Sequence, residues 1–226
     1  MSTPTVPTGR LSADSAHDPC SEWALILLSA ASGAADAFAF LCVGQVFAGV
    51  MTGNLVLLGG SAAGVGEHGV ASRVVTALAA YSCGVALGAW MGERLRWRLP
   101  VQLLVEVVLL ATGAALWGLD LIPSDGNRLG LLAVIALAIG IQGRICATPT
   151  NYFTGTLTAF VGRVALRSLR NKDGWVAGRL IAVAAGATAT ALTLRLRPDA
   201  AAVVAAVLVA GALLIEVMPD RPSRRG

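Results

Sequence analysis

Acidic and polar side chains interrupt several long apolar runs of this 226-residue chain, and they are its best candidates for chemistry. Asp36 lies about twelve residues into the first run, and Glu106 lies about six residues into a later one. An ionised carboxylate at the centre of a membrane costs about 2.5–3.5 kcal/mol on insertion scales, so it must face a cavity, pair with a cation or be protonated. Asp36 therefore predicts an ion, proton or solute site, with a structural hydrogen bond to a neighbouring helix as the alternative. For Glu106 the alternative is an anchor at the membrane edge.

Two Thr-Gly elements, at residues 52–54 and 154–156, are the other candidates. Glycine permits an unwound backbone, while Thr and Asn side chains can satisfy the backbone groups that unwinding frees or offer oxygens to a solute. Non-helical backbone at membrane depth is tolerated only where protein or water covers it. These elements predict a paired solute filter, with helix-packing contacts as the alternative. The predicted pathway residues are Asp36, Thr52, Gly53, Asn54, Glu106, Gln142, Thr154, Gly155 and Thr156.

The remaining reactive side chains indicate neither a metal site nor an enzyme. The four cysteines have no C-x-x-C spacing, three of them lie in apolar runs, and we expect small buried side chains rather than ligands. Both histidines fall in polar stretches, so no base is placed for a nucleophile in a span. We therefore expect no catalytic residues, no metal and no cofactor.

The composition explains why membrane depth is the relevant setting. The chain is 56% hydrophobic and 13% charged, whereas soluble globular proteins have roughly 45–50% apolar and about 25% charged residues. The net charge of +4 comes from short basic clusters between apolar runs, which is typical of membrane topology signals. This pattern excludes a soluble enzyme and a nucleic-acid partner, and it predicts the lipid bilayer as the main partner.

Eight apolar segments define the predicted elements, and most of them are long enough to cross about 30 Å of hydrocarbon. The sixth has only about twelve uncharged residues, which is typical of a re-entrant or interfacial helix. The segments are 24–43, 46–65, 74–92, 101–119, 129–147, 151–162, 175–194 and 200–217. We expect an all-α, polytopic membrane bundle of about six to seven spans.

The order of the motifs repeats along the chain. Each Thr-Gly element follows a span that contains a polar residue, and each precedes a span that ends in an arginine cluster and a proline. A last apolar span closes each half, and these four elements in the same order predict two copies of one unit. The predicted organisation is a disordered tail at 1–22, repeats at 23–119 and 129–217, a loop at 120–128, and a basic C-terminal tail at 218–226.

The distribution of Lys and Arg predicts the orientation. With both Thr-Gly elements re-entrant and the N-terminus inside, twelve basic residues lie inside and four outside, leaving out Arg179 because it lies within a span. With all eight segments crossing, the division is ten and six, so the positive-inside rule favours the first arrangement. Three spans per unit make the repeats inverted, as in many transporters and channels. A seven-span arrangement, in which 46–65 crosses, stays open.

A glycine stripe marks the third apolar segment, at Gly84, Gly88 and Gly92. Small residues four apart let helices approach closely in a membrane. We expect internal helix packing, with a homo-oligomer interface as the alternative.

The motifs at 33–37, 46–47 and 51–54 resemble the YoaK-like family of bacterial membrane proteins, domain-of-unknown-function family 1275. The family's second motif, G-x-Q-N-A followed by T-G-T-L-T, corresponds to residues 140–144 and 154–158. The chain departs from that pattern at Gly143 and Arg144, where the family has Asn-Ala. The resemblance covers residues 23–217 and implies a multi-pass protein of the bacterial inner membrane, but no particular chemistry.

Together these patterns predict a small-solute or ion transporter or channel of the inner membrane, acting between the two repeats with both termini cytoplasmic. The alternative is a non-transporting membrane scaffold or regulatory subunit. The identity of the solute does not follow from the sequence.

Overall fold

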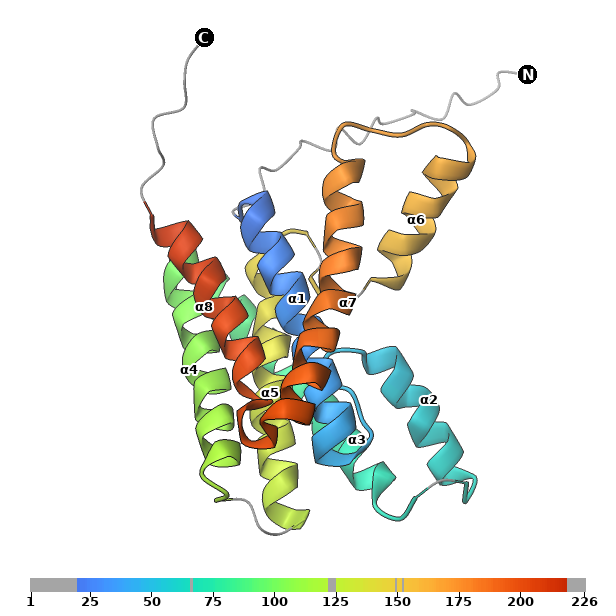
Figure 1. Cartoon of the computed structure of the whole chain (residues 1–226), viewed down its shortest axis with the longest axis vertical. Helices are drawn as coiled ribbons and strands as arrows, with labels where there is room; N and C mark the ends of the chain where they lie inside the picture. Colours follow the sequence, from blue (N-terminus) through green and yellow to red (C-terminus); the bar gives the residue numbers. More distant parts are fainter. Residues whose placement is uncertain (1–19, 66, 122–124, 149, 152, 219–226) are drawn as a thin grey trace, which may run out of the picture.

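The computed structural model describes residues 20–65, 67–121, 125–148, 150–151 and 153–218, and within these ranges every regular element is helical (Figure 1). The predicted all-α class is confirmed. Most of the predicted tails at 1–22 and 218–226, and part of the loop predicted at 120–128, lie outside the described residues. The elements are α1 (Glu22–Phe38), the π-helix η1 (Ala39–Gly44), α2 (Met51–Ala62), α3 (Val70–Glu93), α4 (Leu99–Gly118), α5 (Asp125–Ile145), α6 (Thr154–Ala165), α7 (Asp173–Leu196), the short 3₁₀-helix η2 (Pro198–Ala200) and α8 (Val203–Val217).

Within the part of the chain that the structure describes, five helical stretches are long and apolar enough to cross a membrane by length and composition: Glu22–Gly44, α3, α4, Arg128–Ile145 and α7. Helix α8 is apolar but has 15 residues, and α2 and α6 have 12 residues each. Because a span needs about 20 residues, α2 and α6 are too short to cross alone.

Local sequence explains where the helices begin and end. The Ser21 hydroxyl accepts a hydrogen bond from the Ala24 N–H at 3.3 Å and caps α1. The π-helix η1, which continues α1, ends at Gly44. The next residue, Gln45, has a φ of +58°, in the left-handed region. Helix α4 starts with a proline in its first turn, where the missing N–H costs nothing.

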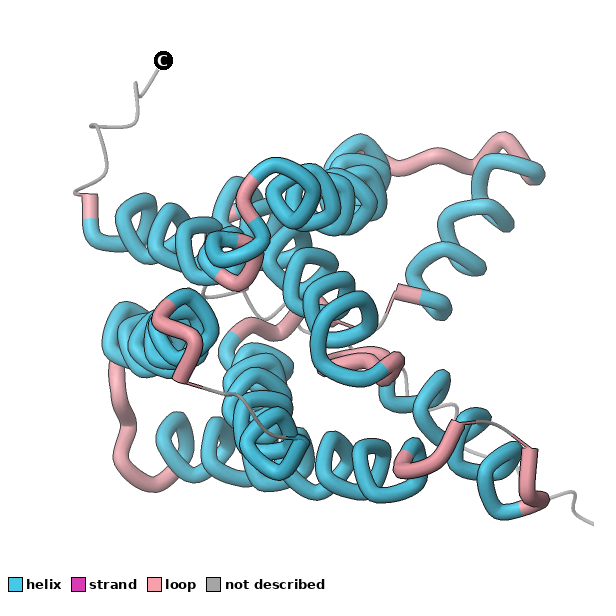
Figure 2. The backbone as a smooth tube through the Cα atoms, turned by 60° about the horizontal axis from the view of Figure 1, so that its bottom comes forward, coloured by secondary structure: helices cyan, strands magenta, loops and turns pink. Residues whose placement is uncertain are grey.

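Helices α1 and α5 form the centre of the bundle. Helix α1 packs against α7 and α8, and α5 packs against α3 and α4, while α4 and α8 also contact each other. Figure 2 shows α2 and α6 on one side of this group of six longer helices. Figure 1 shows both short helices beginning near mid-height and running in opposite directions, α2 downward and α6 upward.

Glycine allows two close helix crossings. A Cβ atom added at Gly33 would overlap the carbonyl oxygen of Val183 on α7, and one added at Gly186 would overlap that of Ala30 on α1. The crossing of α3 and α5 is built in the same way. There, Gly84 faces the carbonyl of Leu137, and Gly140 faces that of Tyr81. Any larger residue at these four glycines would push the helix axes apart.

The glycine stripe on α3 is therefore turned inward for most of its length. Gly84 and Gly88 are buried against α5, where a Cβ at Gly88 would lie 3.1 Å from the Ile141 carbonyl oxygen. Gly92 is less crowded, with the Gln102 side chain as its nearest neighbour at 3.7 Å.

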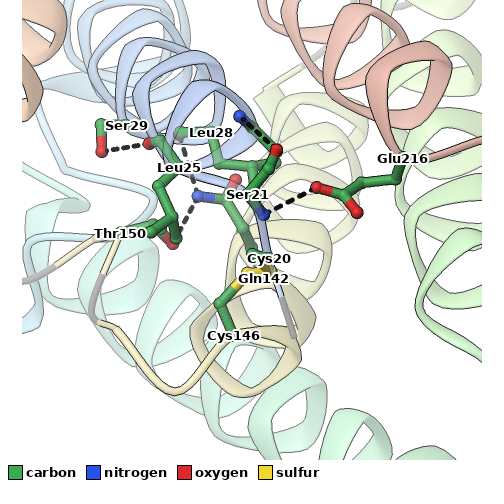
Figure 3. The surroundings of a disulfide bond; sticks show 10 residues. Cys20, Ser21, Leu25, Leu28, Ser29, Gln142, Cys146, Thr150 and Glu216 are labelled. Atoms are coloured by element: carbon green, nitrogen blue, oxygen red, sulfur yellow. Dashed lines mark hydrogen bonds between the residues drawn. A yellow bond between two sulfur atoms is a disulfide. The ribbon is translucent and has the colours of Figure 1, made fainter. Parts of the chain in front are cut away.

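The expectation of small buried side chains did not include a disulfide between two of the four cysteines. Cys20, just before α1, forms a disulfide with Cys146, just after α5 (Figure 3). Residues 126 positions apart gave no spacing signal, because only the tertiary fold brings them together. Cys42 and Cys83 are free.

The crossing geometry predicts a matched pair of glycine variants. Gly186→Ala should lower the Tm of the purified protein, because overpacking costs about 1–3 kcal/mol and exceeds the gain of up to about 1 kcal/mol in helix propensity. Gly162→Ala on α6 is the control, since a Cβ there meets nothing within 4 Å. Its Tm should stay the same or rise. Equal Tm values for Gly186→Ala and the parent protein would show that the crossing is not tightly packed.

Candidate functional site

Asp36, near the end of α1, lies beside the segment that connects η1 to α2. Its Oδ1 accepts a hydrogen bond from the Gly49 N–H at 2.7 Å, and the N–H groups of Ala48 and Val50 also approach the carboxylate. These donors precede the first turn of α2, where negative charge is favoured by the helix dipole. Asp36 therefore holds the entry to α2 in place.

Asn54 holds the same turn from the other side. Its Oδ1 accepts from the Phe47 N–H at 2.9 Å, and its Nδ2 donates to the Phe47 carbonyl at 2.7 Å. The side chain is fully buried. Asn54 thus replaces the backbone partners that Phe47 lacks outside a helix.

At α6, amide side chains in place of a carboxylate hold the segment that leads into the helix. Gln142 on α5 donates through Nε2 to the Leu28 carbonyl and to the Thr150 hydroxyl, both at 2.9 Å (Figure 3). Asn151 donates through Nδ2 to the Ile139 carbonyl at 2.9 Å and to the Tyr81 hydroxyl at 3.2 Å. Because the Ile139 carbonyl can only accept, the Asn151 amide nitrogen must face it, which fixes the position of Oδ1.

A cavity of about 350 Å³ joins the beginnings of α2 and α6, and we call it the inner cavity. Phe153 and Gly155 at the start of α6 line it together with Met51 at the start of α2. Its polar lining side chains are Ser32, Asp36, Thr52, Tyr81, Asn151 and Thr154. Residues from five helices and two connecting segments thus converge on one space.

A second hollow of about 470 Å³ lies beside the first, and we call it the outer groove. It runs between α1 with η1, α7 and the segment before α2, and its lining is mostly apolar, including Phe40, Leu41 and Phe47. Asp36 lines both hollows. As a residue, Asp36 is half-buried.

The structure brings together part of the predicted pathway set. Asp36, Thr52, Thr154 and Gly155 line the inner cavity. The remaining predicted residues, Gly53, Asn54, Glu106, Gln142 and Thr156, line neither hollow.

Glu106 lies instead in the packed part of α4. Its side chain is fully buried, and among the described residues neither carboxyl oxygen has a hydrogen-bond partner. It therefore faces neighbouring helices and contributes nothing to the walls of either hollow.

Three polar residues that line the inner cavity were not predicted from the sequence. Ser32 lies one helical turn before Asp36, so it shares its face of α1. Asn151 lies three residues before Thr154, as Gly49 lies three before Thr52, and this match within the repeat was a usable signal. Tyr81 reaches the cavity only because α3 crosses α5 closely, which no local pattern reveals.

Asp36 is the only Asp, Glu, Lys, Arg or His among the described residues that line the two hollows. Two of the described arginines, Arg144 and Arg163, pair with other acidic residues. Arg144 contacts Glu93 at 3.0 Å at the end of the bundle. Arg163 donates to Asp173, and this hydrogen bond raises the pKa of the arginine.

A family model described as "Protein of unknown function (DUF1275)" matches residues 24–215, which is most of the chain. This match confirms the resemblance seen in the sequence motifs. No curated protein and no solved structure matches the chain.

Proposed function

The chain belongs to the DUF1275 family, whose function is not known, and we propose from the geometry of its site that it is a small-solute or ion transporter or channel of the bacterial inner membrane. The inner cavity carries this proposal. It gathers the beginnings of two short helices and a carboxylate at one place between the long helices. Non-helical backbone of this kind is found at membrane depth where it lines a cavity or is buried in protein.

The two short helices supply the expected chemistry. The first N–H groups of a helix have no partner within the helix, and its N-terminus carries a partial positive charge of about half an elementary charge. Two such ends, from α2 and α6, face the inner cavity. In transporters built from discontinuous helices, these ends bind the polar groups of the solute.

Matching contacts support two inverted repeats, with α1 to α4 corresponding to α5 to α8. The pairs α1–α7 and α5–α3 are equivalent under this match, as are α1–α8 and α5–α4, and each pair is in contact. Both short helices have 12 residues. In the two glycine crossings, Gly33 and Gly140 occupy equivalent positions, as do Gly186 and Gly84.

This arrangement favours six spans and two re-entrant helices. On this proposal α1, α4 and α7 cross in one direction, and α3, α5 and α8 cross in the other. Helices α2 and α6 start at mid-depth and return to opposite faces, as Figure 1 shows for their directions. The two units are then inverted, because each contains three spans.

Charge favours a cytoplasmic location for the end where α1 begins. This end is identified by the Cys20–Cys146 disulfide, the Arg144–Glu93 pair and the Lys172–Glu22 contact at 4.0 Å. Its described basic residues are Arg94, Arg96, Arg98, Arg144, Arg163, Arg167, Arg170 and Lys172, against Arg73, Arg128, Arg195 and Arg197 at the other end. The positive-inside rule then places both chain ends in the cytoplasm.

A transport function predicts that water reaches the inner cavity. Thr52→Cys and Thr154→Cys, made in a background in which Cys20, Cys42, Cys83 and Cys146 are all replaced by alanine, should react with a membrane-impermeant methanethiosulfonate reagent in membrane vesicles. Thr112→Cys is the matched control, because Thr112 is exposed on α4, a candidate span, and lines neither hollow. Lipid should shield it. If the two cavity cysteines react no faster than Thr112→Cys, the site is dry and the scaffold alternative gains.

The orientation predicts the redox state of Cys20 and Cys146 in living cells. A cytoplasmic location is reducing, so both should be thiols there although their positions allow a disulfide. Acid quenching followed by alkylation in denaturant with N-ethylmaleimide should label both, as read by peptide mass spectrometry. Cys42 and Cys83, which are free in the structure, should be labelled in either orientation. A Cys20–Cys146 disulfide in the quenched cells would place this end in the periplasm and reverse the proposed topology.

A further inference from the structure

The inner cavity and the outer groove meet at Asp36 but have opposite characters. Asp36, Val50 and Val183 line both. The inner cavity of about 350 Å³ has hydroxyl and amide side chains, whereas the outer groove of about 470 Å³ is mostly apolar. A solute that fills both must therefore have a polar head and an apolar body.

Asp36 provides the position for a cationic group. No basic side chain among the described residues lines either hollow, so the carboxylate lacks an ionic partner. A carboxylate in a poorly hydrated site is stabilised by an opposite charge. Asn151, which is 2% exposed, also lines the inner cavity, and its buried Oδ1 is an acceptor that has no hydrogen-bond partner among the described residues. An ammonium group, with three donors, suits two acceptors.

The N-terminus of α6 provides the position for an anionic group. Asp36 supplies negative charge at the start of α2, but no side chain caps α6. In the repeat match, Gly33 corresponds to Gly140, so the position of Asp36 corresponds to Gly143, which carries no carboxylate. Thr154 and Gly155, the first residues of α6, line the cavity, and their N–H groups have no acceptor among the described residues. Such a helix end binds carboxylates readily.

The outer groove provides the position for an apolar side chain. Phe40, Leu41, Phe47 and Ala187 are among its walls, and Asp36 lies at its junction with the inner cavity. A hydrocarbon chain attached to an ammonium group at Asp36 can extend into this groove and be removed from water.

We infer that the site binds an apolar α-amino acid, an inference that rests on the proposed transport function for its biological meaning. The ammonium group lies against Asp36 and Asn151, the carboxylate lies against the start of α6, and the side chain lies in the outer groove. The charges of the site balance. The negative charge of Asp36 offsets the partial positive charges at the starts of α2 and α6, which are about half an elementary charge each, and a zwitterion adds no net charge. A lone cation or anion would leave one of the two polar positions unfilled.

Equilibrium binding of tritiated L-leucine to the purified full chain in detergent tests this inference. The competitors each lack one group: isoamylamine lacks the carboxylate, 4-methylpentanoate lacks the ammonium, and glycine lacks the side chain. L-leucine should bind saturably, and each truncated compound should compete at least about tenfold less well, because it loses a charged hydrogen bond or apolar burial. Absent saturable binding, or one truncated compound that equals L-leucine, would overturn the inference.

Variants of the lining residues test which part of L-leucine each residue contacts. Asp36→Asn keeps an acceptor for Gly49 and should weaken L-leucine binding by about tenfold to a hundredfold. Glu106→Gln removes the other buried carboxyl, which lines neither hollow, and should change binding less than about twofold. Ala187→Trp fills the outer groove, leaves Asp36 intact and should also weaken binding at least about tenfold, which covers the case in which Asp36→Asn fails to fold. Unchanged binding in Ala187→Trp and in folded Asp36→Asn would remove both residues from the site.

This measurement is independent of the test of transport. If L-leucine does not bind while the cavity cysteines are reached by water, the amino-acid inference fails and the transport proposal stands. If L-leucine binds while those cysteines stay unreactive, the binding site stands and the transport proposal fails.

Discussion

Two helices of this protein, α2 and α6, begin midway along the bundle, and the backbone N–H groups before and within their first turns need partners there. In an apolar environment an unpaired backbone group is costly, so the polar side chains near these points have little freedom to vary. Asn54 pairs with both backbone groups of Phe47, and Asp36 accepts from Gly49. At α6, Gln142 and Asn151 hold the preceding segment but leave the helix end itself uncapped. This difference between the two ends gives the inner cavity its chemical asymmetry.

The long helices make room for these ends by packing closely elsewhere. Gly33 and Gly186 bring α1 and α7 together, and Gly84 and Gly140 do the same for α3 and α5. In a membrane such contacts are held by van der Waals packing rather than by exclusion of water, so small residues at the crossings matter more than bulky apolar ones. The same crossing brings Tyr81 to the cavity, where its hydroxyl accepts from Asn151. Helix packing and site geometry are therefore set by the same few glycines.

The helical segments and the Thr-Gly starts of the short helices were predictable because hydropathy and glycine act locally along the chain. Asp36 was also predictable as a site residue, since a carboxylate in an apolar run requires an explanation. Glu106 met the same criterion but lies in the packed interior, because residue type alone cannot tell a cavity wall from a helix interface. Asn54 and Gln142 had the right chemistry and support the backbone instead. The Cys20–Cys146 disulfide depends on contacts between distant parts of the chain, which a single sequence does not reveal.

The account depends most directly on the claim that α2 and α6 begin at one shared cavity. Cross-linking of the double variant Thr52→Cys and Thr154→Cys with a short bis-methanethiosulfonate reagent measures this proximity, in a background in which all four native cysteines are replaced by alanine. The account predicts an intramolecular cross-link between the two cysteines, and none when Thr112→Cys replaces Thr154→Cys. If Thr52→Cys and Thr154→Cys each react with a monofunctional reagent but do not cross-link, the two helix ends do not share a cavity and the account is wrong.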